Sequence, residues 1–205
     1  MKAKCPMMKM ECPMIIRDAR PEDAPFLAKC LIAGMHFYDF ETEIPEYKDI
    51  YFDLVDCEKR TDLLYSYKDS RIAEVDGKVV GSLLSYPGDN YKELRRKSFA
   101  VFWPDYIAID EESELETGPG EYYLDTLAVL PEYRRRGIGR ALLEDGIKRG
   151  IAAGYDLITL VVDSNMPDLI RLYESVGFQK AEHRWIFRVD FLRMIYTVKR
   201  QNAKL

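Results

Sequence analysis

The stretch that most constrains the fold of this 205-residue chain runs from Leu127 to Leu143. It continues a β-rich run, Tyr122–Val129, into a loop with three arginines and two glycines. A helix is predicted from Gly137 to about Gly150, because apolar residues recur there at helical spacing opposite a polar row. That polar row consists of Arg140, Glu144 and Lys148. A strand, a glycine loop and an amphipathic helix in this order indicate an α/β (α+β) domain.

The loop has the composition of an anion-binding site. Gly137 and Gly139 allow the backbone to approach a ligand closely, and the free N–H groups of a helix start point at whatever lies there. The helix dipole adds attraction for a phosphate or pyrophosphate, and the arginines Arg134–Arg136 supply further positive charge. The segment therefore predicts binding of a phosphorylated ligand.

Two other interpretations of this loop remain open from the residues alone. It is either a plain strand-to-helix turn with a solvated arginine run, or a dinucleotide-binding fingerprint with Asp163 in the place of the ribose-binding acid. The fingerprint fits less well, because Leu142 occupies its third glycine position. A long loop containing Pro131 also stands where that fold makes a tight turn.

The rest of the chain predicts one domain over residues 14–205, after a loose N-terminal tail over residues 1–13. A D-G pair between two β-rich runs predicts a hairpin with a type I′ turn at Asp76-Gly77. Other predicted strands are Ile15–Ala19, Asp156–Val162, Phe178–Arg184 and Val189–Lys199. Other predicted helices begin at Pro21, span Asp56–Lys68 and Tyr91–Phe102, and run from a cap at Asn165 to Gly177. The last of these carries Leu169, Leu172, Tyr173 and Val176 on one apolar stripe.

Composition narrows the classes of protein. The formal net charge of −5 argues against a nucleic-acid partner. No apolar run approaches the roughly 18 residues of a membrane helix, and the N-terminus lacks the apolar centre of a signal peptide, so we expect a cytoplasmic protein. The four cysteines lack C-x-x-C spacing and, with two histidines, form a poor zinc set, so we expect neither a metal nor a disulfide.

Two motifs together resemble the GNAT superfamily of acyl-CoA-dependent N-acyltransferases. The signature R/Q-x-x-G-x-G/A is met by Arg134–Gly139, preceded by matching residues at Leu127–Val129 and Pro131–Tyr133. The family's N…LYxxxGF pattern is met by Asn165 and Leu172–Phe178. The close resemblance covers Tyr122–Phe178, and it implies a GNAT-like domain with a mixed sheet of six to seven strands flanked by helices.

The resemblance also implies acetyl-CoA as acyl donor, held by a splayed strand pair without a metal. The backbone of Leu127 and Val129 would pair with the pantetheine arm, and amides of Arg135–Arg140 would hold the pyrophosphate. Asn165 would lie beside the cofactor. The positions implied for the cofactor are Leu127, Ala128, Val129, Arg134, Arg135, Arg136, Gly137, Ile138, Gly139, Arg140 and Asn165.

Tyr173 would stand near the thioester sulfur as general acid. The chemistry agrees, because a tyrosine titrates near 10 and a thiol near 8.5, so that a neutral tyrosine can protonate a departing thiolate. The alternative is a core aromatic on the apolar stripe of its helix.

The general base is expected on the strand that precedes the loop. Period-2 alternation places Tyr123, Asp125, Leu127 and Val129 on one face, which looks toward the acceptor in the family. Asp125 is the first candidate, directly or through a water, and Tyr123 the second. The alternative is an ordinary strand aspartate on a solvated face.

The acceptor is left open between a small amine, an antibiotic, a polyamine, an amino acid and a protein terminus. The acids of the segment His36–Phe52 either wall the acceptor pocket, where they would attract a cationic amine, or belong to a solvated loop. These acids are Asp39, Glu41, Glu43 and Glu46. The same segment and the insert Pro87–Gly120 are expected to set specificity. Where members resembling ribosomal-protein N-terminal acetyltransferases carry a Glu, this chain has Leu160, which argues against a close copy of their substrate chemistry.

These observations lead to one functional hypothesis and two rivals. The hypothesis is direct acetyl transfer from acetyl-CoA to a small-molecule or peptide amine within a ternary complex, by a monomer or homodimer with no nucleic-acid or membrane partner. The first rival is a CoA-binding sensor that has lost catalysis. It is disfavoured because Tyr173 and the face of Asp125 are intact. The second is nucleic-acid binding by Arg134–Arg140.

Overall fold

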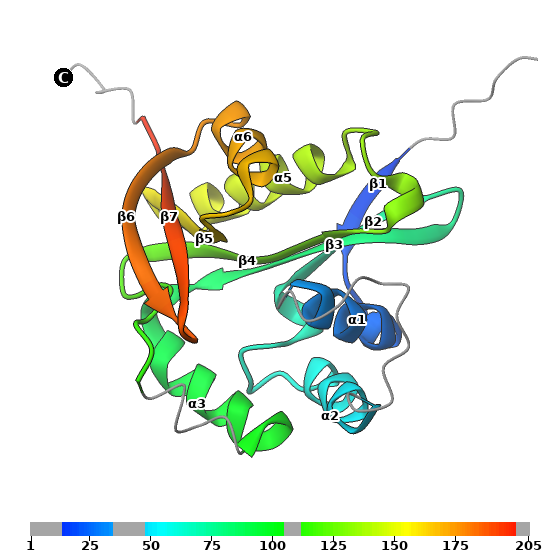
Figure 1. Ribbon diagram of the computed structural model, residues 1–205. Coiled ribbons are helices and arrows are strands. Elements are labelled where there is room, and N and C mark those ends of the chain that lie inside the picture. Colours follow the sequence, from blue (N-terminus) through cyan, green and yellow to red (C-terminus); the bar gives the residue numbers. More distant parts are fainter. Residues whose placement is uncertain (1–13, 35–47, 105–111, 200–205) are drawn as a thin grey trace, which may run out of the picture.

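Seven strands form one sheet in the order β1-β2-β3-β4-β5-β7-β6 (Figure 1). The structure is a computed structural model that describes residues 14–34, 48–104 and 112–199. All neighbouring strands are antiparallel except β4 and β5, which run parallel. The strands are β1 (Ile15–Asp18), β2 (Ser70–Val75), β3 (Lys78–Pro87), β4 (Glu121–Val129), β5 (Leu157–Asp163), β6 (Gln179–Ile186) and β7 (Val189–Thr197). The predicted α/β (α+β) class with a mixed sheet of six to seven strands is confirmed.

Helices cover both faces of the sheet. In Figure 1, α5 (Ile138–Ala152) and α6 (Pro167–Ser175) lie above it, and three helices lie below. The lower helices are α1 (Ala24–Gly34), α2 (Lys48–Lys59) and α3 (Tyr91–Phe102). Each layer has its own hydrophobic core, one around Leu142 and Ile158 and the other around Leu54 and Phe99. The sheet therefore separates two cores, and a site at a gap in the sheet can be reached by side chains of both.

The local turn chemistry agrees with the sequence at several points. Asp76 and Gly77 both have positive φ, 54° and 73°, as a type I′ hairpin turn requires. The predicted helix Tyr91–Phe102 is α3 with the same bounds. Gly177 has φ 107° directly after α6, which fits its predicted place at the end of that helix.

The helix predicted at Asp56–Lys68 is wrong. The observed α2 ends at Lys59, and the chain then turns so that Leu63, Leu64 and Tyr65 are all buried in succession. Side chains hold this turn, since the Ser66 hydroxyl donates to the Arg60 carbonyl at 2.6 Å. Consecutive apolar residues there serve an irregular buried segment, which helical periodicity does not distinguish from a helix.

The predicted cap at Asn165 is also wrong. Met166 occupies the N-cap position of α6, and Pro167 begins the helix. The exposed Asn165 side chain instead donates to the Asp163 carboxylate at 3.1 Å, which closes the turn between β5 and α6.

Some predictions lie outside the described residues. These are the loose tail over residues 1–13 and the acids Asp39–Glu46. Within the described ranges, no helix is long and apolar enough to cross a membrane. The same ranges contain no cluster of three or more His, Cys, Asp or Glu side chains arranged to hold a metal ion.

Candidate active site

The parallel strands β4 and β5 separate after a short paired stretch. They pair only from Glu121–Tyr123 to Leu157–Thr159. Beyond that point β5 stays paired with β7 through Asp163, whereas no strand in the described part of the chain pairs with the β5-facing edge of β4 up to Val129. The sheet therefore opens at its centre and leaves backbone groups of β4 without a ladder partner.

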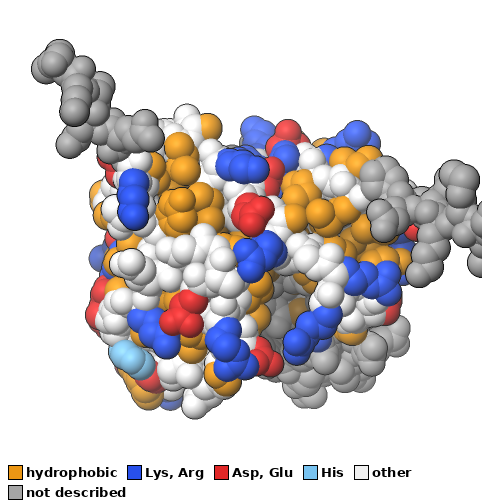
Figure 2. Space-filling model, turned by 90° about the horizontal axis from the view of Figure 1, so that it is seen from above, with side chains coloured by type: hydrophobic (Ala, Val, Ile, Leu, Met, Phe, Trp, Pro, Cys, Tyr) orange, Lys and Arg blue, Asp and Glu red, His pale blue; other side chains and the backbone are white. Residues whose placement is uncertain are grey.

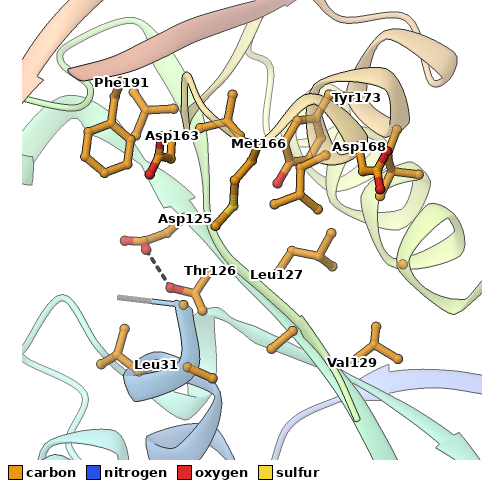
Figure 3. Close-up of a pocket in the computed structure, with 18 of the residues that line it drawn as sticks. Leu31, Asp125, Thr126, Leu127, Val129, Asp163, Met166, Asp168, Tyr173 and Phe191 are labelled. Atoms are coloured by element: carbon orange, nitrogen blue, oxygen red, sulfur yellow. Dashed lines mark hydrogen bonds between the residues drawn. The ribbon is translucent and has the colours of Figure 1, made fainter. Parts of the chain in front are cut away.

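A cavity of about 1190 Å³ occupies this opening (Figure 3). It brings together every candidate site residue predicted from the sequence except Arg136 and Asn165, which do not line it. We call the part lined by Leu127–Val129, by residues 133–135 and 137–140 and by α6 the arginine half. We call the part lined by the following residues the acidic half: Leu31, Tyr65, Phe99, Trp103, Glu116, Tyr123, Asp125, Thr126, Asp163, Ile186, Phe187, Val189 and Phe191.

The start of α5 lies in the arginine half. Gly137 is the N-cap residue and has φ 83°. Because glycine has no side chain, the backbone N–H groups of the first helical turn receive no side-chain cap. A Cβ added at Gly139 would lie 3.8 Å from Leu127 and Leu172, so the hydrogen atom at this position leaves space between the helix and β4. The amides of Ile138–Arg140 are therefore open to an anion from the cleft.

The four arginines at and just before the start of α5 are held differently. Arg134 Nε donates to the Val129 carbonyl at 3.0 Å, and Arg140 donates to the Ser175 carbonyl at 3.1 Å. Arg136 donates to the Glu132 carbonyl at 2.8 Å and lies over the Tyr133 ring, which keeps it out of the cleft. The Arg135 side chain is 90% exposed. Figure 2 shows Lys and Arg side chains on both sides of a hollow in the face on which α5 and α6 lie.

Tyr173 places its hydroxyl in the cleft (Figure 3). Its ring is 8% exposed and makes an edge contact with Phe178. The hydroxyl makes no hydrogen bond with another described residue, so its proton is available to a ligand. Burial raises the pKa of Tyr173 to about 12, and the hydroxyl is therefore protonated at neutral pH.

A bulge in β4 changes which side chains share a face. Leu83 pairs with Leu127 and Ser85 with Leu124, so Asp125 and Thr126 together lie opposite one residue of β3. Leu127 packs beneath α5, whereas Asp125 contacts the lower core through Tyr86. Val129 likewise packs against the upper core, and Tyr123 belongs to the lower core. The predicted single face of four residues is therefore wrong, because the extra residue shifts the alternation.

The bulge aims Asp125 into the acidic half. Its carboxylate accepts hydrogen bonds from the Tyr86 hydroxyl and, at 2.8 Å, from the Thr126 hydroxyl (Figure 3). Burial and the negative charge of Glu116 outweigh these bonds and raise the pKa of Asp125 to about 7. A carboxylate that titrates near neutrality suits a general base.

Tyr123 has a different role. Its hydroxyl donates to Glu116 at 2.6 Å, and its ring packs against Tyr86 and Tyr91, which stack on each other. Burial and the nearby carboxylates raise the pKa of Tyr123 well above its ordinary value. The hydroxyl is held as a donor, so Asp125 is the better candidate for the base.

Several lining residues were not identified from the sequence. Glu116 and Trp103 come from the insert Pro87–Gly120, and Phe187 lies at the tip of the β6–β7 hairpin. None belongs to a motif, and only their predicted membership of a specificity-setting insert pointed to the first two. The folded chain, not local spacing, brings them together.

A family model described as Acetyltransferase (GNAT) family matches residues 35–178. A [Ribosomal protein bS18]-alanine N-acetyltransferase of Escherichia coli K12 is 34% identical over 99 residues, which are 46% of this chain and 57% of that protein. A mycothiol acetyltransferase of Thermobispora bispora is 37% identical over 89 residues, 43% of this chain and 28% of that protein. The chain thus spans less than two thirds of either relative.

The fold is similar to that of a solved N-acetyltransferase from Staphylococcus aureus Mu50. The two structures have a TM-score of 0.72 at 23% sequence identity, and the match covers 88% of this chain and 99% of that one. At this identity the comparison shows a likeness of fold.

Proposed function

Because the chain belongs to the acetyltransferase (GNAT) family, we propose that it moves an acetyl group from acetyl-CoA to a primary amine, by direct transfer in a ternary complex. The observation that carries the proposal is that one cleft contains an uncapped helix start, the Tyr173 hydroxyl and the Asp125 carboxylate. These groups match, respectively, the phosphates, the leaving thiolate and the amine proton of such a reaction.

Acetyl-CoA would occupy the arginine half. Its pyrophosphate would accept hydrogen bonds from the amides of Ile138–Arg140, with Arg135 adding charge at the rim. Its pantetheine arm would lie along Leu127–Val129, where β4 has no neighbouring strand on its β5 side. An extended amide chain there supplies the hydrogen-bond partners that the opened sheet lacks.

The chemical step uses both halves. Asp125 removes a proton from the ammonium group, and the free amine attacks the thioester carbonyl carbon. As the tetrahedral intermediate collapses, the C–S bond breaks and Tyr173 protonates the CoA thiolate. The nitrogen loses its second proton to water as the amide forms, water returns a proton to Tyr173, and Asp125 releases its proton to solvent, so the products are an N-acetyl amide, CoA with a free thiol and one proton. The unpaired backbone N–H groups of β4 are the groups that would stabilise the oxyanion.

A covalent acetyl-enzyme is disfavoured by the residues that line the cleft. No cysteine lines it in the described part of the chain. Cys30 and Cys57 are buried, and burial raises the pKa of each thiol to about 12, which keeps both protonated and unreactive. Direct attack on the bound thioester is the route that these residues support.

The rival is a CoA-binding protein without catalysis. The uncapped helix start fits both functions, whereas the position of Asp125 and Tyr173 in one cleft favours the enzyme. The relatives named above act on different acceptors, an alanine of ribosomal protein bS18 and mycothiol, so their names do not decide the acceptor here. Leu160 is buried in the upper core and supplies no carboxylate to the cleft.

Donor binding is tested with Gly139→Asp. The substitution places a side chain and a negative charge where the pyrophosphate would lie, in a space that accommodates a Cβ. We expect calorimetry to show no CoA binding by the folded variant. Gly118→Asp is the matched control, because a Cβ at Gly118 meets open space and this residue does not line the cleft. Unchanged CoA affinity in folded Gly139→Asp would contradict the proposed donor site.

A further inference from the structure

The acidic half contains more carboxylates than the proposed reaction requires. Glu116, Asp125 and Asp163 line it, and no Lys, Arg or His lines it among the residues described by the structure. The arginine half, by contrast, contains Arg134, Arg135, Arg140 and Arg171 with Asp168. An ammonium group is attracted to the acidic half, whereas a carboxylate entering there meets like charge.

Glu116 is the fixed centre of this charge. Its Oε2 accepts from the Tyr123 hydroxyl at 2.6 Å, and its Oε1 lies 3.9 Å from Arg95 Nη1 behind it. Arg95 is 2% exposed and does not line the cleft, so it orients Glu116 from the core side. The carboxylate is thereby held at the cavity wall with its side chain 16% exposed.

Aromatic rings form much of the remaining wall. Tyr65, Phe99, Trp103, Phe187 and Phe191 line the acidic half. Rings around a carboxylate favour a cation, through the electron-rich ring faces, and favour a flat apolar body by burial.

Phe187 is held in place against its backbone preference. Phe187 and Arg188 both have positive φ, 49° and 65°, a backbone conformation that residues other than glycine rarely adopt. Phe187 N–H donates to the Ser113 hydroxyl at 3.0 Å, and the ring lies 4.7 Å from the Arg95 guanidinium. Arg95 therefore orients both the carboxylate and one ring, which preorganises this wall for a ligand.

Among the residues that the structure describes, the side-chain hydroxyls of Thr126 and Tyr123 in the acidic half are already used. The Thr126 hydroxyl donates to Asp125 and the Tyr123 hydroxyl to Glu116. A hydroxyl-rich acceptor would find hydrogen-bond partners mainly in the carboxylates and none in the ring faces that form much of the wall. The wall therefore favours an apolar body over an aminosugar.

From these features, and resting on the proposed transferase activity, we propose that the acceptor is a primary amine on an aromatic or comparably flat apolar body, without a carboxylate beside the amine. Glu116 is the residue that selects it. The amine is drawn toward Asp125 and Glu116, the body packs against Trp103 and Phe187, and a carboxylate next to the nitrogen is repelled. An arylalkylamine has all of these properties, whereas the amino acid with the same ring does not.

The test compares matched acceptors at saturating acetyl-CoA. We expect kcat/KM for 2-phenylethylamine to exceed that for phenylalanine and for glucosamine by at least about tenfold, the factor that corresponds to 1.4 kcal/mol. In Glu116→Gln the preference for 2-phenylethylamine over phenylalanine should shrink several-fold. Glu112→Gln, which removes an exposed acid that does not line the cleft, should keep the wild-type preference.

A second variant tests the body of the acceptor independently of Glu116. Trp103→Leu should lower kcat/KM for 2-phenylethylamine several-fold more than for ethylamine, because only the former has a ring to pack. Equal or better transfer to phenylalanine, glucosamine or an alanine-terminated peptide would overturn the inference while leaving the transferase intact. No transfer to any of these amines by an enzyme that binds CoA would contradict the proposed function itself.

Discussion

The two halves of the cleft are built from very different stretches of sequence. The arginine half comes largely from one continuous segment, Leu127–Arg140, together with α6. The acidic half is assembled from α1, Tyr65, α3, Glu116, β4 and the β6–β7 hairpin, which are far apart in the chain. One half presents backbone amides and arginines, whereas the other presents carboxylates and rings. A ligand common to many proteins can be bound by a local motif, but a specific acceptor needs a wall that only the tertiary fold creates.

The largest expected effect is that of Asp125→Asn in the acidic half. Removal of the proposed base should lower kcat/KM at pH 7 by about 10³-fold, with CoA affinity unchanged, because the arginine half is untouched. The loss should diminish as the pH approaches the amine pKa near 10, since more acceptor is then already deprotonated. Steady-state kinetics from pH 7 to 9.5 measure this, with the surface variant Asp56→Asn as control. An equal loss of CoA affinity would contradict the division between the halves.

Tyr173→Phe should have the next largest effect. It removes a hydroxyl that has no described partner and leaves the ring packed on Phe178. We expect kcat to fall about 10²-fold with stability and CoA affinity maintained, and the loss should be smaller for an acyl donor with a more acidic thiol. Tyr196→Phe, whose ring also packs on Phe178 but does not line the cleft, is the control. Wild-type kcat in Tyr173→Phe would show that water protonates the thiolate.

A smaller effect is expected on the pH dependence. Asp125, the proposed base, can accept a proton only when deprotonated, so kcat/KM should rise with pH through about 7. Burial and Glu116 raise the pKa of Asp125, while Tyr86, Thr126 and Arg95 lower it. Glu116→Gln removes one raising influence, so the acid limb of the profile should move to lower pH. A limb that stays in place would show that Glu116 does not influence the base.

The smallest expected effect concerns stability beneath the acidic half. Glu58 is 2% exposed, and burial with the nearby charges of Asp125 and Asp69 raises its pKa from 4.5 to about 8. Between these values the folded state retains a proton that the unfolded state releases, so stability falls as pH rises, by at most about 1.4 kcal/mol per pH unit. Glu58→Gln should flatten this dependence in urea unfolding at pH 5 and pH 8, and Glu112→Gln should not. An unchanged slope would mean that Glu58 does not titrate in this window.

The features that could be predicted from the sequence belong mostly to the arginine half of the cleft, and those that could not belong mostly to the acidic half. Gly137 and Gly139, and the turn at Asp76-Gly77, encode their backbone conformations locally, so the sequence indicated the helix start and the hairpin. Tyr173 could be proposed from the sequence because a motif surrounds it, and the structure places it in the cleft. The bulge at Asp125 was not foreseen, since alternation alone does not reveal an extra residue.

The acidic wall could not be predicted for a related reason. Glu116 depends on Arg95 and Tyr123, and Phe187 depends on Arg95 and Ser113, through contacts between residues separated by up to 92 positions in the printed sequence. The end of α2 was likewise misplaced, because burial of Leu63 and Leu64 comes from tertiary packing. Such contacts leave no periodic signal in the chain.

The most direct test of the account is the stoichiometry of the reaction with acetyl-CoA and a primary amine. Free CoA thiol and N-acetylated amine are quantified in the same samples, and the protein is weighed by mass spectrometry before the amine is added. The account predicts one N-acetyl product for each thiol released, thiol release that depends on the amine, and a protein of unchanged mass. Thiol release without amide formation, or a protein that carries an acetyl group on the pathway, would contradict direct transfer between the two halves of the cleft.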